Sequence, residues 1–149
     1  MATNIESLLN ELIETSMDGE NGFRKAANDA RDAELKSLFT TCAARCAEGA
    51  RELQQVVKVG GGDPEKTGSV AAALHRGWIS VKEAMTDRDD KAILEECERG
   101  EDYAKVQYKK ALQQDLPENI RAVVQRQYDG VIANHDKVRA LRDSYRRAT

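Results

Sequence analysis

The residues of this chain with the clearest chemical potential belong to a short repeat. The dipeptide Gly-Glu occurs at Gly19-Glu20 and again, 81 residues later, at Gly100-Glu101, each time inside a segment with helical character. A glycine within a helix costs about 1 kcal/mol relative to alanine. It also removes a side chain, which lets a neighbouring helix or a ligand come close. The repeat therefore predicts two equivalent places where a neighbouring helix or a ligand lies close to a helix beside a carboxylate.

Helical geometry indicates where these carboxylates point. At about 100° per residue, Glu20 lies about 60° from the centre of its apolar stripe. Glu101 lies between Leu94 and Tyr108, each about 20° away. His135 lies about 60° from the stripe of the last helical segment. We expect all three polar side chains to face the interior or its edge, where an unpaired charge is costly.

Glu20, Glu101 and His135 are the candidate metal ligands. Carboxylate oxygens and imidazole nitrogens are ligands for iron and manganese, so the predicted cofactor is iron or manganese. If the helices pair as expected, His135 lies about one turn (~6 Å) from the depth of Glu101. The alternative is a buried hydrogen bond between Glu101 and His135 that fixes the register of the helices. In that case the chain has no metal, and no catalytic residue is predicted in either case.

Three cysteines are the remaining reactive residues. Cys42 and Cys46 are four residues apart on one helix face and are expected at the depth of Glu20. An odd number of cysteines without a Cys-x-x-Cys motif predicts neither a disulfide framework nor a zinc ribbon. We interpret Cys42, Cys46 and Cys97 as small core residues. A thiol redox pair at Cys42 and Cys46 is the alternative.

The elements that must position these residues are helices. Apolar residues recur at helical spacing in four long segments and one short one. These are residues 4–30, 33–59, 69–85, 90–114 and 117–145. Gly60-Gly61-Gly62-Asp63-Pro64 ends the second segment, and short loops join the first to the second and the fourth to the fifth. The expected fold is an all-α antiparallel four-helix bundle made of two similar hairpins, with a short crossover helix, as a single domain over residues 1–149.

Composition limits the classes of function. The chain of 149 residues is 40% hydrophobic, 33% charged and 5% aromatic, which suits one aliphatic core. Its net charge of -3 speaks against a nucleic-acid binder. There is no secretory signal pattern, and no run approaches the ~18 apolar residues of a membrane span. We expect a cytoplasmic protein that binds neither nucleic acid nor membrane, with Trp78 on the short helix favouring a homodimer.

The chain resembles an uncharacterised bacterial family of ferritin-like four-helix-bundle proteins, a domain of unknown function. The stretches that carry the resemblance are LLNELIETSMDGENGFRKAA, ALHRGW, AILEECERGEDYA and QYDGVIANHDKVRALRD. The resemblance implies the ferritin-like fold but no established reaction. A ferritin-like di-metal site uses one Glu on each of two helices and Glu-x-x-His on each of the other two. Here Arg51 stands where one histidine belongs and Ile132 where one glutamate belongs, so that only His135 matches.

Two functions are consistent with these observations. The first is a non-catalytic bundle protein that acts by assembly or partner binding, with stress adaptation as its setting. The second is a metal-binding ferritin-like protein with an incomplete di-metal site.

Overall fold

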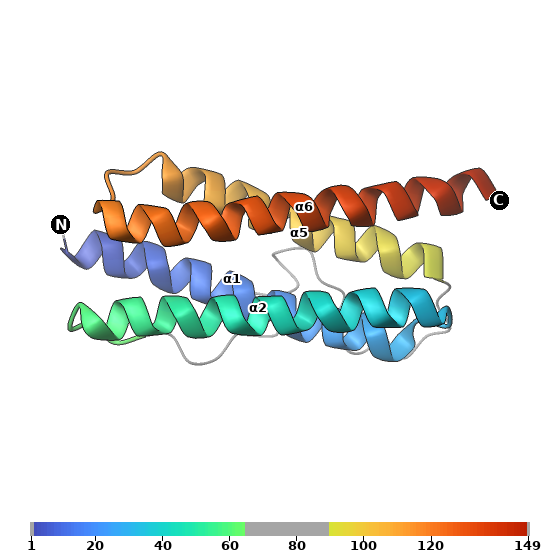
Figure 1. The fold of residues 1–149 in the computed structure, drawn as a ribbon, viewed down its shortest axis with the longest axis horizontal. Coiled ribbons are helices and arrows are strands. Elements are labelled where there is room, and N and C mark those ends of the chain that lie inside the picture. Colours follow the sequence, from blue (N-terminus) through green and yellow to red (C-terminus); the bar gives the residue numbers. More distant parts are fainter. Residues whose placement is uncertain (1, 65–89, 149) are drawn as a thin grey trace.

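Four long helices make up the part of the chain that the computed structural model describes, residues 2–64 and 90–148. They are α1 (Ala2–Asp29), α2 (Ala33–Val59), α5 (Asp90–Leu112) and α6 (Glu118–Ala148). These ranges contain no strand, and all four helices run along the long axis of the molecule (Figure 1). The predicted short helix over 69–85, with Trp78, lies outside the described residues.

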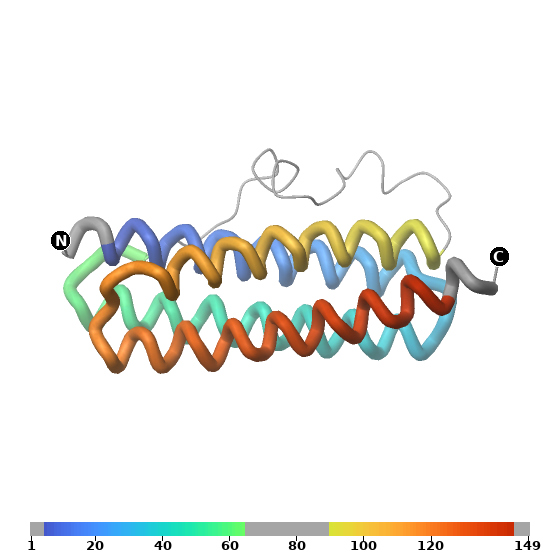
Figure 2. Tube along the Cα trace, turned by 90° about the horizontal axis from the view of Figure 1, so that it is seen from above, coloured from blue at the N-terminus to red at the C-terminus, as the bar shows by residue number. Residues whose placement is uncertain are grey.

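The helices pair as two hairpins, α1 with α2 and α5 with α6. Figure 2 shows the α5–α6 turn at the end where α1 begins and the α1–α2 turn at the opposite end. Helix α1 also packs along α5, whereas α2 and α6 contact each other much less. The all-α four-helix bundle predicted from the sequence is therefore confirmed, with its loosest seam between α2 and α6.

Polar caps fix the ends of the first hairpin. The Asp32 carboxylate accepts a hydrogen bond from the backbone N–H of Glu34 at 2.8 Å, as an N-cap does. The Asp90 carboxylate accepts from the N–H groups of Arg31 and Asp32 at 2.8 and 3.0 Å, which ties the α1–α2 turn to the start of α5. Helix α2 ends at the predicted glycine breaker, where Gly61 has a φ of 85° that glycine adopts at little cost.

The apolar interior forms two separate cores. The core near the α1–α2 turn includes the stacked rings of Phe23 and Phe39, whose centroids are 6.1 Å apart. Its other buried members are Ala26, Ala30, Leu35, Cys42, Ala43, Ile93, Leu94, Cys97 and Val138. The core near the α5–α6 turn consists of Leu9, Leu12, Ile13, Leu53, Val57, Tyr108, Ala111, Leu116 and Val124. Each core joins all four helices, and the middle of the bundle lies between them.

Helices α1 and α2 come close together at Gly19. A Cβ atom built on this residue would lie 2.9 Å from Sγ of Cys46, closer than side chains normally pack. At Gly49, by contrast, the nearest atoms to such a Cβ belong to Gln127 at 3.6 Å, which is ordinary contact. A side chain at position 19 would therefore force the Cys46 sulfur to shift, which agrees with the close helix approach that the sequence repeat suggested.

This contact predicts a stability coupling between Gly19 and Cys46. We expect Gly49→Ala to raise the free energy of unfolding by up to about 1 kcal/mol, because alanine is the better helix former. Gly19→Ala should raise the free energy of unfolding by less, because the added Cβ meets the Cys46 sulfur. In a Cys46→Ala background, Gly19→Ala should be more stabilising than in the wild type by about 0.5–2 kcal/mol. Urea unfolding of the four proteins of this double-mutant cycle measures the coupling. An equal effect of Gly19→Ala in both backgrounds would contradict it.

Candidate functional site

A cavity of about 610 Å³ occupies the middle of the bundle, between the two cores. All four helices line it, and each contributes one glycine. These glycines are Gly19, Gly49, Gly100 and Gly130. Phe23, Ala104 and Val131 provide apolar side chains, and the remaining lining is polar. Side chains of the facing helix lie against three of these glycines: Cys46 at Gly19, Gln127 at Gly49 and Arg45 at Gly130.

The glycines of α2 and α6 extend the repeat found in the sequence. Gly49 and Gly130 are separated by 81 residues, the same offset that separates Gly19 from Gly100. Arg45 and Arg126 have this offset too, so that each of these helices carries the pattern Arg-x-x-x-Gly. The site predicted from the sequence rested on the Gly-Glu pair alone. Applying its offset to the second helix of each hairpin would have identified the other two glycines and both arginines.

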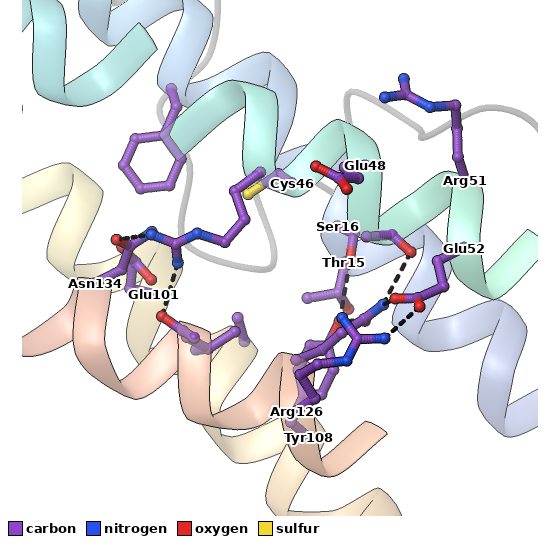
Figure 3. A pocket seen from close by; sticks show the side chains of 18 of the residues that line it. Thr15, Ser16, Cys46, Glu48, Arg51, Glu52, Glu101, Tyr108, Arg126 and Asn134 are labelled. Carbon is purple, nitrogen blue, oxygen red and sulfur yellow. Dashed lines mark hydrogen bonds and ion pairs between the residues drawn. The ribbon is translucent and has the colours of Figure 1, made fainter. Parts of the chain in front are cut away.

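Arg45 bridges the seam between α2 and α6 on one side of the cavity. Its guanidinium donates to the backbone carbonyl of Gly130 at 2.7 Å and to Oδ1 of Asn134. Asn134 is buried, and Figure 3 shows it beside Glu101. A charged donor that meets two acceptors of the opposite helix holds the seam together where apolar contact is sparse.

A second set of hydrogen bonds closes the other side of the cavity and joins all four helices (Figure 3). Gln127 donates to the Gly49 carbonyl at 3.3 Å and to Oε1 of Glu52 at 2.7 Å, while Arg126 pairs with Oε2 of Glu52. The Tyr108 hydroxyl donates to Oε1 of Gln127 at 2.7 Å and lies 3.2 Å from the Ser16 hydroxyl. Every link in this chain of side chains is satisfied, which favours a single arrangement of the helices.

Glu101 is the exception among the buried polar side chains that line the cavity. Its side chain belongs to a residue only 4% exposed, and its Oε1 is buried without a hydrogen-bond partner among the described residues. Burial raises the pKa of this carboxyl to about 8; Arg45 opposes the shift and the neighbouring Asp102 adds to it. The cavity therefore holds a carboxyl group that is largely protonated at neutral pH and whose Oε1 has no partner among the described residues.

The other two predicted metal ligands lie elsewhere. Glu20 is half-buried at the edge of α1 and forms an ion pair with Arg24. It misses the cavity because Ser16, Gly19 and Phe23 occupy the inward face of α1 at this height.

His135 is buried as expected, but the predicted hydrogen bond to Glu101 is wrong. Nε2 of His135 pairs with Asp102, the residue next to Glu101, and Nδ1 of His135 has no hydrogen-bond partner among the described residues. Across residues 2–64 and 90–148, no three His, Cys, Asp or Glu side chains lie close enough together to hold a metal ion. The residues as arranged do not fit a di-metal centre, although metal binding itself stays a prediction.

The cysteine thiols are poorly suited to redox chemistry. Cys42 and Cys97 are buried core residues and Cys46 lines the cavity. Burial raises the pKa of Cys42 to about 12, with Glu101 adding to the shift, and raises that of Cys46 further for the same reasons. A thiol that stays protonated is a weak nucleophile, which favours the interpretation as core residues.

Fold and site together define a four-helix bundle with a cavity at its centre. The chain belongs to a family described as a domain of unknown function, DUF2383, which it matches over residues 4–114. This match covers α1, α2 and α5, while α6 lies beyond it. A comparison with curated proteins finds no match. Within the described part of the chain, no helix has an apolar stretch long enough to cross a membrane.

The buried carboxyl predicts how stability changes with pH. An ordinary glutamate, with a pKa of 4.5, loses its proton well before Glu101 does in the folded protein at about 8. Between these values folding takes up a proton, so the free energy of unfolding falls as pH rises and levels off above about 8. Each pKa unit is about 1.4 kcal/mol, so the loss is on the order of a few kcal/mol.

Glu101→Gln should remove this loss. We expect the variant to match the wild type near pH 4.5 and to be more stable than it by a few kcal/mol near pH 9. Urea unfolding across this pH range measures the difference, and Glu48→Gln on the exposed rim is the control. Parallel pH profiles for wild type and Glu101→Gln would show that the carboxyl is not held in a water-poor site.

Proposed function

We propose that this protein is a non-catalytic binding protein that holds a small organic molecule in the cavity at the middle of its bundle. The observation that carries the proposal is the coincidence of four glycines, one per helix, with an unpartnered buried carboxyl oxygen of Glu101 in the same cavity. A folded chain loses stability at each helical glycine and at each unsatisfied buried polar atom. A bound molecule would compensate for both.

The size and lining of the cavity suit such a ligand. Sites for small molecules enclose about 300–1,000 Å³, combine apolar walls with a few convergent polar groups, and are often found between the helices of bundles. The cavity of about 610 Å³ has apolar walls at Phe23, Ala104 and Val131, and its polar groups come from all four helices. This supports the partner-binding function inferred from the sequence, with a small molecule as the partner.

A larger side chain that fills the cavity should raise the stability of the protein and weaken its binding of a small molecule. Ala104 lines the cavity at the position equivalent by the 81-residue offset to Phe23. We expect Ala104→Phe to raise the free energy of unfolding by about 0.5–2 kcal/mol, as cavity-filling changes do. It should also weaken the binding of the neutral probe 2-phenylethanol by roughly tenfold or more, because it occupies the same space. Thermal unfolding and NMR titration of the backbone amides measure the two effects.

Val106→Phe is the matched control. Val106 lies on the same helix but is 53% exposed, so the added ring stays outside the cavity. We expect it to leave probe binding unchanged. If Ala104→Phe binds 2-phenylethanol as tightly as the wild type does, the proposed function is wrong.

Metal binding is the second proposal, and the unpartnered Oε1 of Glu101 is the observation that favours it. An oxygen acceptor in a buried site suits a cation such as iron or manganese. Against this, Glu20 and His135 are engaged by Arg24 and Asp102, so a metal would require both side chains to move.

Metal content separates the two proposals. Protein purified without a histidine tag and then loaded aerobically with iron is analysed by elemental mass spectrometry. If the cavity holds an organic molecule, we expect only traces of iron and manganese. About two bound equivalents that disappear in Glu101→Ala but persist in Glu48→Ala would establish the metal site instead.

The setting of either function also remains a proposal. We propose a cytoplasmic protein of ferritin-like ancestry that takes part in stress adaptation and does not bind nucleic acid. A homodimer is part of the same proposal, but its basis was Trp78, which lies outside the described residues.

A further inference from the structure

We propose that the ligand of the central cavity is an organic amine, bound as its ammonium cation by the carboxylate of Glu101, with its apolar body against the glycine-lined walls. This inference rests on the proposed binding function and specifies its ligand class. It follows from which polar groups of the cavity are occupied by the protein itself and which are left over.

Among the buried side-chain polar atoms of the cavity, one lacks a partner within the described residues, whereas the Glu48 carboxylate at the cavity rim is exposed to water. Glu52 accepts from Arg126 and Gln127, and the amide oxygen of Asn134 accepts from Arg45. The carbonyl groups of Gly49 and Gly130 accept from Gln127 and Arg45. Oε1 of Glu101 lines the same cavity and has no such donor among the described residues. The protein thus leaves one acceptor, a carboxylate oxygen, for a donor that comes from outside.

The cations of the cavity, in contrast, already have partners inside. Arg45 is the cation that lowers the pKa of the Glu101 carboxyl. Its two terminal nitrogens, however, donate to the Gly130 carbonyl and to Oδ1 of Asn134. Arg126 is paired with Glu52. Arg51 is exposed, and Figure 3 shows it on the opposite side of the view from Glu101. An anionic ligand would have to displace protein acceptors from Arg45 or Arg126. An ammonium ligand instead pairs with Glu101 as the carboxyl releases its proton to solvent, and the positive charge favours that release.

The surroundings of Glu101 are compatible with this pairing. Helix α1 contributes only Thr15, Ser16, Gly19 and Phe23 to the cavity lining, none of which carries a charge. On α2 the nearby titratable groups are Arg45 and the protonated thiols Cys42 and Cys46. Asp102 on α5 is directed to His135 on α6. A donor that is charged makes a stronger hydrogen bond to a buried carboxylate than a neutral one.

The apolar lining of the cavity favours an apolar group as the remaining part of the ligand. Glycine and Ala104 leave room beside the carboxyl, and Phe23 and Val131 offer apolar contact. Alkyl or aromatic groups gain free energy from leaving water for such walls. An ammonium group on an alkyl or aryl body therefore matches both parts of the cavity.

Three probes of the same shape but different charge test the ligand class: 2-phenylethylamine, neutral 2-phenylethanol and anionic phenylacetate. We expect the full-length protein to bind the amine roughly tenfold or more tightly than the alcohol, and phenylacetate most weakly. In Glu101→Gln, which keeps the shape of the side chain, the amine should lose this advantage while the alcohol still binds. Glu48→Gln, a loss of one exposed charge at the cavity rim, should keep the wild-type order.

Each outcome bears on a different inference. If the alcohol binds as tightly as the amine in the wild type, or if Glu101→Gln keeps the preference, the amine inference is overturned while the binding function stands. Preferred binding of phenylacetate overturns it as well. If none of the probes shifts the amide signals of the cavity residues, the binding function itself fails, and the ligand class with it.

Discussion

Two apolar cores, one at each end of the bundle, hold the four helices at a fixed spacing, and the rest of the structure depends on this division. Phe39 and Leu53 are fully buried in different cores, although they belong to the same helix α2. Between the cores lies the cavity, a gap that the side chains around its glycines leave unfilled. The helices cannot collapse onto this gap, because the packed side chains on both sides keep them apart.

The seam between α2 and α6 follows the same constraint in its chemistry. Apolar contact across it is sparse, so polar side chains bridge it. Arg45 reaches from α2 to Gly130, and Gln127 reaches from α6 to Gly49. The two bonds are similar, because each runs from a side chain of one helix to a glycine carbonyl of the other, and the two glycines are 81 residues apart. The two hairpins thus share the frame of the cavity at an 81-residue offset, while their glutamates differ, since Glu20 lies at the edge and Glu101 lines the centre.

The sequence predicted the framework well and the site only in part. Helical periodicity and breakers gave α2 its bounds, with Asp32 as its cap, and placed Glu101 inside. Periodicity resolves direction only to about the 100° step between adjacent residues. It could not tell that His135 pairs with Asp102 and not with Glu101. The cavity escaped prediction for another reason: it arises from how the side chains of four helices pack between the two cores, and the relative depth of these side chains is known only once the hairpins are aligned.

The polar bridges across the α2–α6 seam have a consequence for motion. A hydrogen bond between side chains contributes only about 0.5–1.5 kcal/mol net, because water replaces it when it breaks. Parting α2 from α6 at mid-height would therefore exchange the bonds of Arg45 and Gln127 for water while both apolar cores stay packed. Local openings of this kind need far less free energy than global unfolding. The two apolar cores close the ends of the cavity, and polar contacts bridge α2 and α6 along its side. The interior of the cavity can therefore exchange with solvent without loss of the fold.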